Sequence, residues 1–187
     1  MIYSTEPLTW VEVTSMSAIL NGRNHDDGVR IVRAIVDAPP RTVFVFDCSY
    51  VAVMDYSYAN EFVYAAICAL GDCALSQKFL MVKSACNSVW ENIDAALLAK
   101  SVACVITGQG ANGRLDIAGA LSPALRDTFR FMVDRDATTT ADLPSNLSPS
   151  TRSNRLRDLE SAGLIYLTAT EFIKAGGRRF AYKVVGS

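Results

Sequence analysis

Three short apolar runs constrain the fold of this chain more than any other feature of its sequence. Residues 43–46, 79–82 and 103–107 are almost entirely apolar, and each run has the length of a strand that is buried on both faces. Residues 58–70 and 89–100, which lie between these runs, carry apolar side chains at helical spacing. Strands that alternate with helices predict an α/β domain with a largely parallel sheet.

Two further segments extend this pattern toward the N-terminus. Residues 8–14 alternate sufficiently between apolar and polar side chains to form a strand. Asp26 or Asp27 is expected to cap a helix that continues to residue 38, and Pro39 and Pro40 stop it there. We therefore expect the α/β domain to cover residues 1–108.

A glycine-rich stretch follows the last predicted strand. The spacing is that of the motif G-x-G-x-x-G, formed by Gly108, Gly110 and Gly113. In a dinucleotide-binding fold this motif opens a long helix, but here Gly119 and Pro123 interrupt the residues that follow. We interpret residues 109–120 as a linker between two domains, and a phosphate-binding loop of an enzyme over residues 108–114 is the alternative.

The stretch SPSTRSNRLRDLESAGLIYL, residues 148–167, predicts a helix followed by a strand. Ser148 is the candidate N-cap, and Pro149 takes the first helical position, where its missing N–H costs nothing. Leu156 and Leu159 form a narrow apolar seam, so most of the helix surface is polar. This pattern is typical of the recognition helix of a helix-turn-helix, and the alternative is a solvated amphipathic helix.

The elements around this helix have the order of a winged helix-turn-helix. Ser122 is expected to cap a first helix, a second short segment follows, and the recognition helix leads into a hairpin. The two preceding segments are expected over residues 123–135 and 138–147, and the hairpin strands over 164–168 and 178–185. Three helices and a hairpin predict an α+β winged helix-turn-helix domain over residues 121–187.

Composition excludes several classes of function. The five cysteines form no C-x-x-C pair and the chain has one histidine, so we expect free thiols and no metal site. The sequence lacks a G-x-S-x-G serine elbow and a pair of catalytic carboxylates with a base, so we expect no enzyme and no cofactor. No apolar run reaches the roughly 18 residues of a membrane span, and the first residues do not resemble a signal peptide. We therefore expect a cytoplasmic protein with no membrane partner.

Charge is distributed unevenly along the chain. Residues 1–120 contain 8 Lys/Arg and 12 Asp/Glu, a balance of −4, whereas residues 121–187 contain 10 and 7, a balance of +3. The total is the −1 of the whole chain. An acidic first domain and a basic second domain indicate different partners, with the basic one suited to phosphate contacts.

Residues 43–63 carry a resemblance to a known family. In VFVFDCSYVAVMDYSYANEFV, an apolar strand ends in Asp47, and Asp55 precedes a hydroxyl-rich turn and a helix that begins Ser-Tyr-Ala-Asn-Glu at residues 57–61. This resembles the STAS domains of anti-sigma-factor antagonists, and more closely the divergent STAS-like family, whose helix begins Ser-aromatic-Ala-Asn/Asp-Glu. The resemblance covers roughly residues 8–108 and implies a module for protein interaction or sensing, without an active site.

The resemblance also makes Asp55, Tyr56 and Ser57 a candidate regulatory turn. In the antagonists the phosphorylated serine follows the aspartate directly, but Tyr56 stands there in this chain and Ser57 comes one residue later. A phosphate at the start of the helix would meet unpaired N–H groups, but Asp55 and Glu61 would repel it. Ser57 as the helix cap is the alternative interpretation.

Residues 121–185 resemble winged-helix regulators of the HxlR and MarR kind. Residues 147–165 begin Leu-Ser-Pro, continue Arg-Leu-x-x-Leu and end Gly-Leu-Ile, as the recognition helix of these families does. Two residues depart from the pattern: Arg152 stands where the families bury an aliphatic side chain, and Pro144 interrupts the preceding helix. We expect Arg152 either to extend along the seam toward a phosphate or to face a partner domain.

The DNA-binding interpretation assigns a role to each polar side chain. The residues expected to enter the major groove are Ser150, Thr151, Asn154 and Arg155. Arg157 is expected to contact the DNA backbone, and the wing residues expected to contact phosphates or the minor groove are Lys174, Arg178 and Arg179. One domain covers one half-site, so we expect a homodimer on double-stranded DNA.

The sequence therefore predicts a two-domain, DNA-binding transcription regulator whose STAS-like domain serves dimerisation, partner binding or signal sensing. The alternative is a non-enzymatic component of a partner-switching pathway in which the winged helix binds protein. Both hypotheses allow a protein partner at the STAS-like domain. They differ in whether the basic second domain binds DNA.

Overall fold

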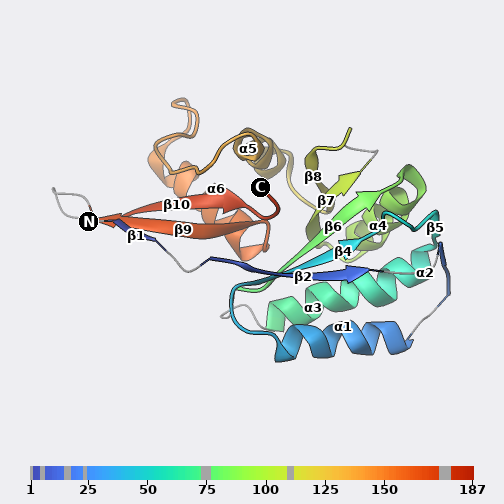
Figure 1. The fold of residues 1–187 in the computed structure, drawn as a ribbon. Helices are drawn as coiled ribbons and strands as arrows, with labels where there is room; N and C mark the ends of the chain where they lie inside the picture. Colours follow the sequence, from blue (N-terminus) through green and yellow to red (C-terminus); the bar gives the residue numbers. More distant parts are fainter. Residues whose placement is uncertain are drawn as a thin grey trace. The chain divides into compact units, whose positions relative to one another are not determined.

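The computed structural model has a mixed α/β fold with a mostly parallel sheet (Figure 1), and it describes residues 2–4, 7–14, 18–22, 25–72, 77–108, 112–172 and 178–187. The chain divides into two compact units. The sheet unit is Leu8–Leu121, and the helix–hairpin unit is Met1–Pro7 together with Ser122–Ser187. The first residues of the chain thus belong with its last third, which differs from the predicted domain of residues 1–108.

The sheet unit is built on five strands. In spatial order they are β2 (Thr9–Thr14), β4 (Thr42–Asp47), β6 (Phe79–Ala85), β7 (Ala103–Gly108) and β8 (Leu115–Gly119). The first four are parallel and β8 is antiparallel to β7, so the predicted, mostly parallel sheet is confirmed. Its apolar runs behave as expected: Val43, Phe44, Val45 and Phe46 are all buried, as a strand with two covered faces requires.

Helices cover one face of this sheet. They are α1 (His25–Asp37), the continuous segment α2 (Tyr56–Ala59), η1 (Asn60–Tyr64) and α3 (Ala65–Asp72), and α4 (Asn87–Ala99). Ile35, Val63 and Ile93 from these helices share one core with Phe44 and Phe46, which lie on the same side of β4. The helices predicted between the strands are confirmed to within a few residues.

A two-stranded parallel sheet lies beside the start of α2. It pairs β3 (Ile19–Leu20) with β5 (Val53–Met54). The N–H of Asp55 then donates to the carbonyl of Leu20 at 2.9 Å. This pairing attaches residues 18–22 to the turn that leads into α2.

The predicted linker is wrong for residues 115–119, because they form β8. The N–H of Gly119 donates to Asp94 Oδ1 in α4 at 2.7 Å, which attaches the strand to that helix. Gly119 has a φ of +93°, and a Cβ atom there would lie 2.2 Å from the Val102 carbonyl oxygen, so only glycine fits. Gly110 lies outside the described residues, as do the rest of residues 109–111.

The helix–hairpin unit combines helices with an antiparallel sheet. Its elements are β1 (Ile2–Ser4), α5 (Pro123–Val133), α6 (Pro149–Ser161), β9 (Ile165–Phe172) and β10 (Arg178–Val184). The strand order is β1-β9-β10, with both pairs antiparallel. The capped first helix, the helix predicted after Ser148 and the hairpin are therefore present, and β1 is a strand that the sequence did not reveal.

The predicted second helix over residues 138–147 is wrong. Thr138 forms a bridge with Tyr182 of β10 through N–H···O bonds of 2.8 and 2.9 Å. Two turns follow, closed by N–H···O bonds from Asp142 to Thr139 at 3.2 Å and from Leu147 to Pro144 at 3.1 Å. Proline lacks an N–H and disfavours helical backbone in the residue before it, so turn formation prevails over the apolar pattern.

Candidate nucleic-acid interface

The boundaries of α6 follow from its capping residues. Ser148 is the N-cap, and its Oγ accepts a hydrogen bond from the Thr151 N–H at 3.2 Å. Pro149 occupies the first helical position. After the helix, Gly163 has a φ of +70°, a conformation that glycine adopts without strain, and β9 begins two residues later.

Two leucines anchor this helix. Leu156 and Leu159 are 1% and 0% exposed, and α6 packs against α5 and β9. Other buried apolar side chains of the unit are Phe129, Met132, Leu143, Leu164, Ile165, Val184 and Val185. The predicted seam is therefore confirmed, and it occupies one narrow side of the helix.

The opposite side of α6 carries exposed polar side chains. Ser150, Asn154 and Arg157 are exposed, and their spacing of four and three residues places them on one face. At 100° per residue, this face is about 160° from the leucine seam. The Arg157 guanidinium donates to Asn154 Oδ1 at 3.1 Å, which orients both side chains. The arrangement offers a hydroxyl, an amide and a guanidinium to a partner from one surface.

Two other predicted reading residues are partly buried and lie at the side of this surface. Arg155 donates from Nη1 to Thr128 Oγ1 of α5 at 3.2 Å, and Thr128 is itself 4% exposed. Thr151 has its Oγ1 2.8 Å from Ser148 Oγ, within the capping turn. These contacts stabilise the position of α6 and reduce the freedom of both side chains to meet a base.

Arg152 is turned back toward the chain that enters α6. Its Nε donates to the Leu147 carbonyl at 3.0 Å, and its Nη2 donates to the Ser145 carbonyl at 3.1 Å. Arg152 lies four and seven residues before Leu156 and Leu159, so it lies on the seam side of the helix. Of the two expected arrangements, the stem along the seam is present, and the guanidinium binds backbone carbonyls of the preceding turn.

The hairpin supplies the remaining predicted cations. Arg178 and Arg179 are exposed at the start of β10, and Arg179 Nη1 lies 3.7 Å from Glu171 Oε2 on β9. Lys174 lies outside the described residues.

Thr139 donates two hydrogen bonds of 2.7 Å to Asp142, and these bonds, assisted by Arg179 and Arg135, hold the pKa of Asp142 below its usual value.

The candidate regulatory turn has Asp55 as its helix cap, so the alternative of Ser57 as the cap is wrong. The Asp55 carboxylate accepts from the Gly22 N–H at 2.7 Å and from the Tyr58 N–H at 2.8 Å. These bonds, the Gly22 bond first, lower the pKa of Asp55. Tyr56 is 43% exposed and Ser57 is partly buried. The turn is thus fixed to residues 18–22 by a charged side chain.

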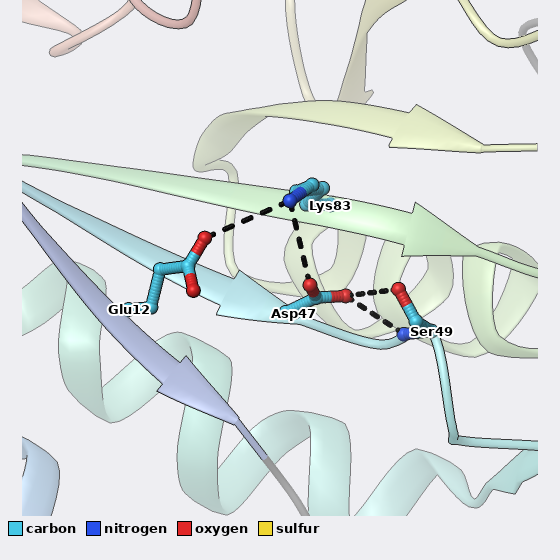
Figure 2. A network of polar contacts seen from close by, with 4 residues as sticks. All are labelled: Glu12, Asp47, Ser49 and Lys83. Atoms are coloured by element: carbon cyan, nitrogen blue, oxygen red, sulfur yellow. Dashed lines mark hydrogen bonds and ion pairs between the residues drawn. The ribbon is translucent and has the colours of Figure 1, made fainter.

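A polar cluster that the sequence did not reveal lies at the carboxyl ends of three parallel strands (Figure 2). Lys83 Nζ of β6 lies 3.5 Å from Asp47 Oδ2 of β4 and 3.7 Å from Glu12 Oε1 of β2. Ser49 donates to Asp47 from its N–H at 2.9 Å and from its hydroxyl at 2.5 Å. Burial raises the pKa of Asp47, but the Ser49 bonds and the Lys83 ammonium outweigh burial and hold it below its usual value.

Register explains why this cluster was missed. Asp47 faces Lys83 directly across β4 and β6, whereas Glu12 is opposite Val45 and reaches Lys83 across the intervening strand. The only sequence signal was one charged residue near the end of each of three strands, and their order in the sheet was needed to bring them together. With Lys83 and Glu12 about half exposed, the cluster links strands and contributes little to stability.

No protein family matches this chain, and the comparisons with curated proteins and with solved structures found no match either. Among the described residues, no helix is long and apolar enough to cross a membrane. The same residues contain no group of three or more His, Cys, Asp or Glu side chains arranged to hold a metal ion.

Proposed function

We propose that this chain is a DNA-binding transcription regulator, acting as a cytoplasmic homodimer, in which α6 is the recognition helix of a winged helix-turn-helix. The observation that carries the proposal is the division of α6 into two opposite sides. Leu156 and Leu159 hold one side against the unit, while Ser150, Asn154 and Arg157 are exposed together on the other. A helix must be anchored and exposed in this way to enter a major groove.

The chemistry of the exposed side suits base recognition. An asparagine amide can bond adenine through two hydrogen bonds, and a guanidinium beside it can bond a backbone phosphate. Asn154 and Arg157 are held next to each other by their own hydrogen bond. We therefore assign base reading to Asn154, with Ser150 beside it, a contact with the DNA backbone to Arg157, and a supporting role to Arg155 through Thr128.

Two further features support the DNA-binding interpretation. The order α5, a bridge at Thr138, α6 and the hairpin β9–β10 is compatible with a winged helix whose second helix is replaced by turns. The exposed Arg178 and Arg179 stand at the start of the second hairpin strand, as wing cations would. The sheet unit, with Asp55 at the start of its central helical segment, is compatible with the STAS-like resemblance and is proposed to sense a signal or bind a partner.

Selection of DNA by the full-length chain tests the proposal. A pool of random duplexes is selected with the protein, and the affinity for the enriched duplex is measured by mobility shift at several salt concentrations. Asn154→Ala should lower that affinity about tenfold, since a bidentate base contact contributes roughly 1–3 kcal/mol to discrimination. Arg33→Ala, a change of an exposed arginine on α1, is the matched control and should bind normally. Failure to enrich any sequence would contradict the proposal.

A partner-switching role without DNA is the second candidate, and the surface beside Asp55 favours it. Ile19, Val53 and Tyr56 are 58%, 48% and 43% exposed, and Ile19 and Val53 are paired in register. A photo-crosslinking side chain at position 53 should capture a protein partner under this hypothesis. The same side chain at position 36, where the valine on α1 is 57% exposed, is the control. Equal capture at both positions would argue against a specific surface.

A further inference from the structure

We propose that Arg152 is a positioning residue, which fixes the direction in which the chain enters the recognition helix. This inference rests on the proposed function and deepens it, because it separates the arginine that orients α6 from the residues that meet DNA. The residues before α6 form turns, not a helix, so this entry lacks the support of a packed helix. A planar guanidinium can supply that support by bonding two carbonyls at once.

The contacts of Arg152 point away from a DNA-facing role. Its two hydrogen bonds go to Ser145 and Leu147, both in the turn that precedes the helix. Its position on α6 is on the same side as the buried Leu156, opposite the side that exposes Asn154. A side chain that reaches back along the seam to backbone carbonyls is not directed toward a phosphate beyond the exposed side.

Charge also explains why an arginine is held there. The N-terminal turn of a helix carries a partial positive charge, so a cation near it is ordinarily disfavoured. The carbonyls of Ser145 and Leu147 carry the opposite partial charge and offset this effect for Arg152. The carbonyls of this turn therefore stabilise the positive charge of Arg152 at the start of the helix.

These bonds complete the fixation of residues 138–147. The first residue of this segment is held by the bridge between Thr138 and Tyr182, and its last residues are held by Arg152. Without Arg152 the cap at Ser148 remains, but the turn before it is free to change direction. The exposed side of α6 would then meet bases in a range of orientations, which lowers specificity and leaves the number of phosphate contacts unchanged.

The test compares three substitutions at this position on two duplexes, the one selected by the wild-type chain and a scrambled duplex of equal length. Arg152→Met should lower the affinity for the selected duplex about tenfold and leave the affinity for the scrambled duplex and the salt dependence unchanged. Arg152→Gln should retain most of the affinity, because its amide nitrogen lies as many bonds from Cα as Nε does and can donate to Leu147. Arg152→Lys adds a variant that keeps the charge without the planar fork.

A phosphate contact would give the opposite pattern and would overturn the inference. Arg152→Met and Arg152→Gln would then both reduce the slope of log affinity against log salt by about 0.9, and only Arg152→Lys would retain affinity. Arg157→Gln is the matched control on the same helix, and it should reduce that slope. A loss of stability alone is recognised because it lowers the unfolding temperature without changing the ratio of the two affinities.

Failure of the proposed function can be distinguished from failure of this inference. If the wild-type chain selects no duplex, the DNA-binding proposal fails, and amide hydrogen exchange decides the role of Arg152. The Leu147 N–H, which donates to the Pro144 carbonyl, should exchange faster in Arg152→Met than in Arg157→Gln. Equal exchange in the two variants would overturn the inference.

Discussion

Each of the two units of this chain is stabilised internally by a different kind of contact. The sheet unit has one continuous core between the sheet and the helices α1, α2–α3 and α4. Its largest buried side chains include Phe44 and Phe46. The helix–hairpin unit has a smaller core around Phe129 and Leu156, and polar contacts complete it. Those contacts are the Ser148 cap, the Arg155–Thr128 bond, the Arg152 bonds and the Thr138 bridge.

This difference has a physical reason. A parallel strand buried on both faces needs apolar side chains on both, so the sheet unit commits its sequence to packing. A helix that presents one side to a partner can bury only a narrow seam, so its position must be fixed by caps and side-chain bonds. The unit proposed to bind DNA thus keeps an exposed polar surface because polar contacts replace part of the core packing that holds the sheet unit.

Truncating a buried side chain in either core should cause the largest loss of stability. Phe46→Ala should destabilise the sheet unit by about 3–5 kcal/mol, and Leu156→Ala the helix–hairpin unit by about 2–5 kcal/mol. Both tryptophans of the chain, Trp10 and Trp90, lie in the sheet unit, so tryptophan fluorescence during denaturation reports that unit alone. Phe46→Ala should shift this transition and Leu156→Ala should not. If both variants shift the fluorescence transition equally, the two units unfold together and are not stabilised separately.

A smaller effect is expected from removing β1. A chain that begins at Pro7 lacks the three residues paired with Ala169–Glu171 of β9, and it should lose about 1–2 kcal/mol of stability in the helix–hairpin unit. Amide exchange at these β9 residues should become faster, while the fluorescence transition of the sheet unit stays in place. Unchanged exchange in β9 would show that β1 does not stabilise this unit.

The smallest expected effect is a difference between the two units in how their stability changes as the pH falls. The lowered pKa values of Asp47 and Asp55 mean that their stabilisation of the sheet unit is present above the unfolded pKa of about 3.9 and is lost as the pH falls below it. In the helix–hairpin unit, burial raises the pKa of Glu160, so the folded state takes up a proton first and gains stability as the pH falls toward about 4.3. Below that range the lowered pKa of Asp142 makes this unit lose stability as well.

Glu160→Gln provides the control for this comparison. The variant should lose the gain of the helix–hairpin unit between neutral pH and pH of about 4.3 and keep the acid response of the sheet unit. Fluorescence follows the sheet unit, and amide exchange of β9 and β10 follows the other. A gain that persists in Glu160→Gln would assign it to another group.

Sequence patterns predicted the elements whose signals are local. The apolar runs of β4, β6 and β7 and the helical stripes between them lie within single windows of the chain, and so do the Ser148 cap and the leucine seam of α6. The prediction failed where two local signals compete: a helix was expected over residues 138–147, yet Pro144 and the Thr139–Asp142 contacts favour turns.

Apolar periodicity dictates which surfaces must be buried, so the mostly parallel α/β sheet and the helix with one apolar and one polar side could be predicted from local sequence. Pairing between distant segments placed β1 with the last third of the chain, made residues 115–119 a strand and brought Lys83 into contact with both Glu12 and Asp47. Side-chain direction also determined that Arg152 binds Ser145 and Leu147. These outcomes depend on strand pairing and side-chain direction, which are set by partners elsewhere in the chain.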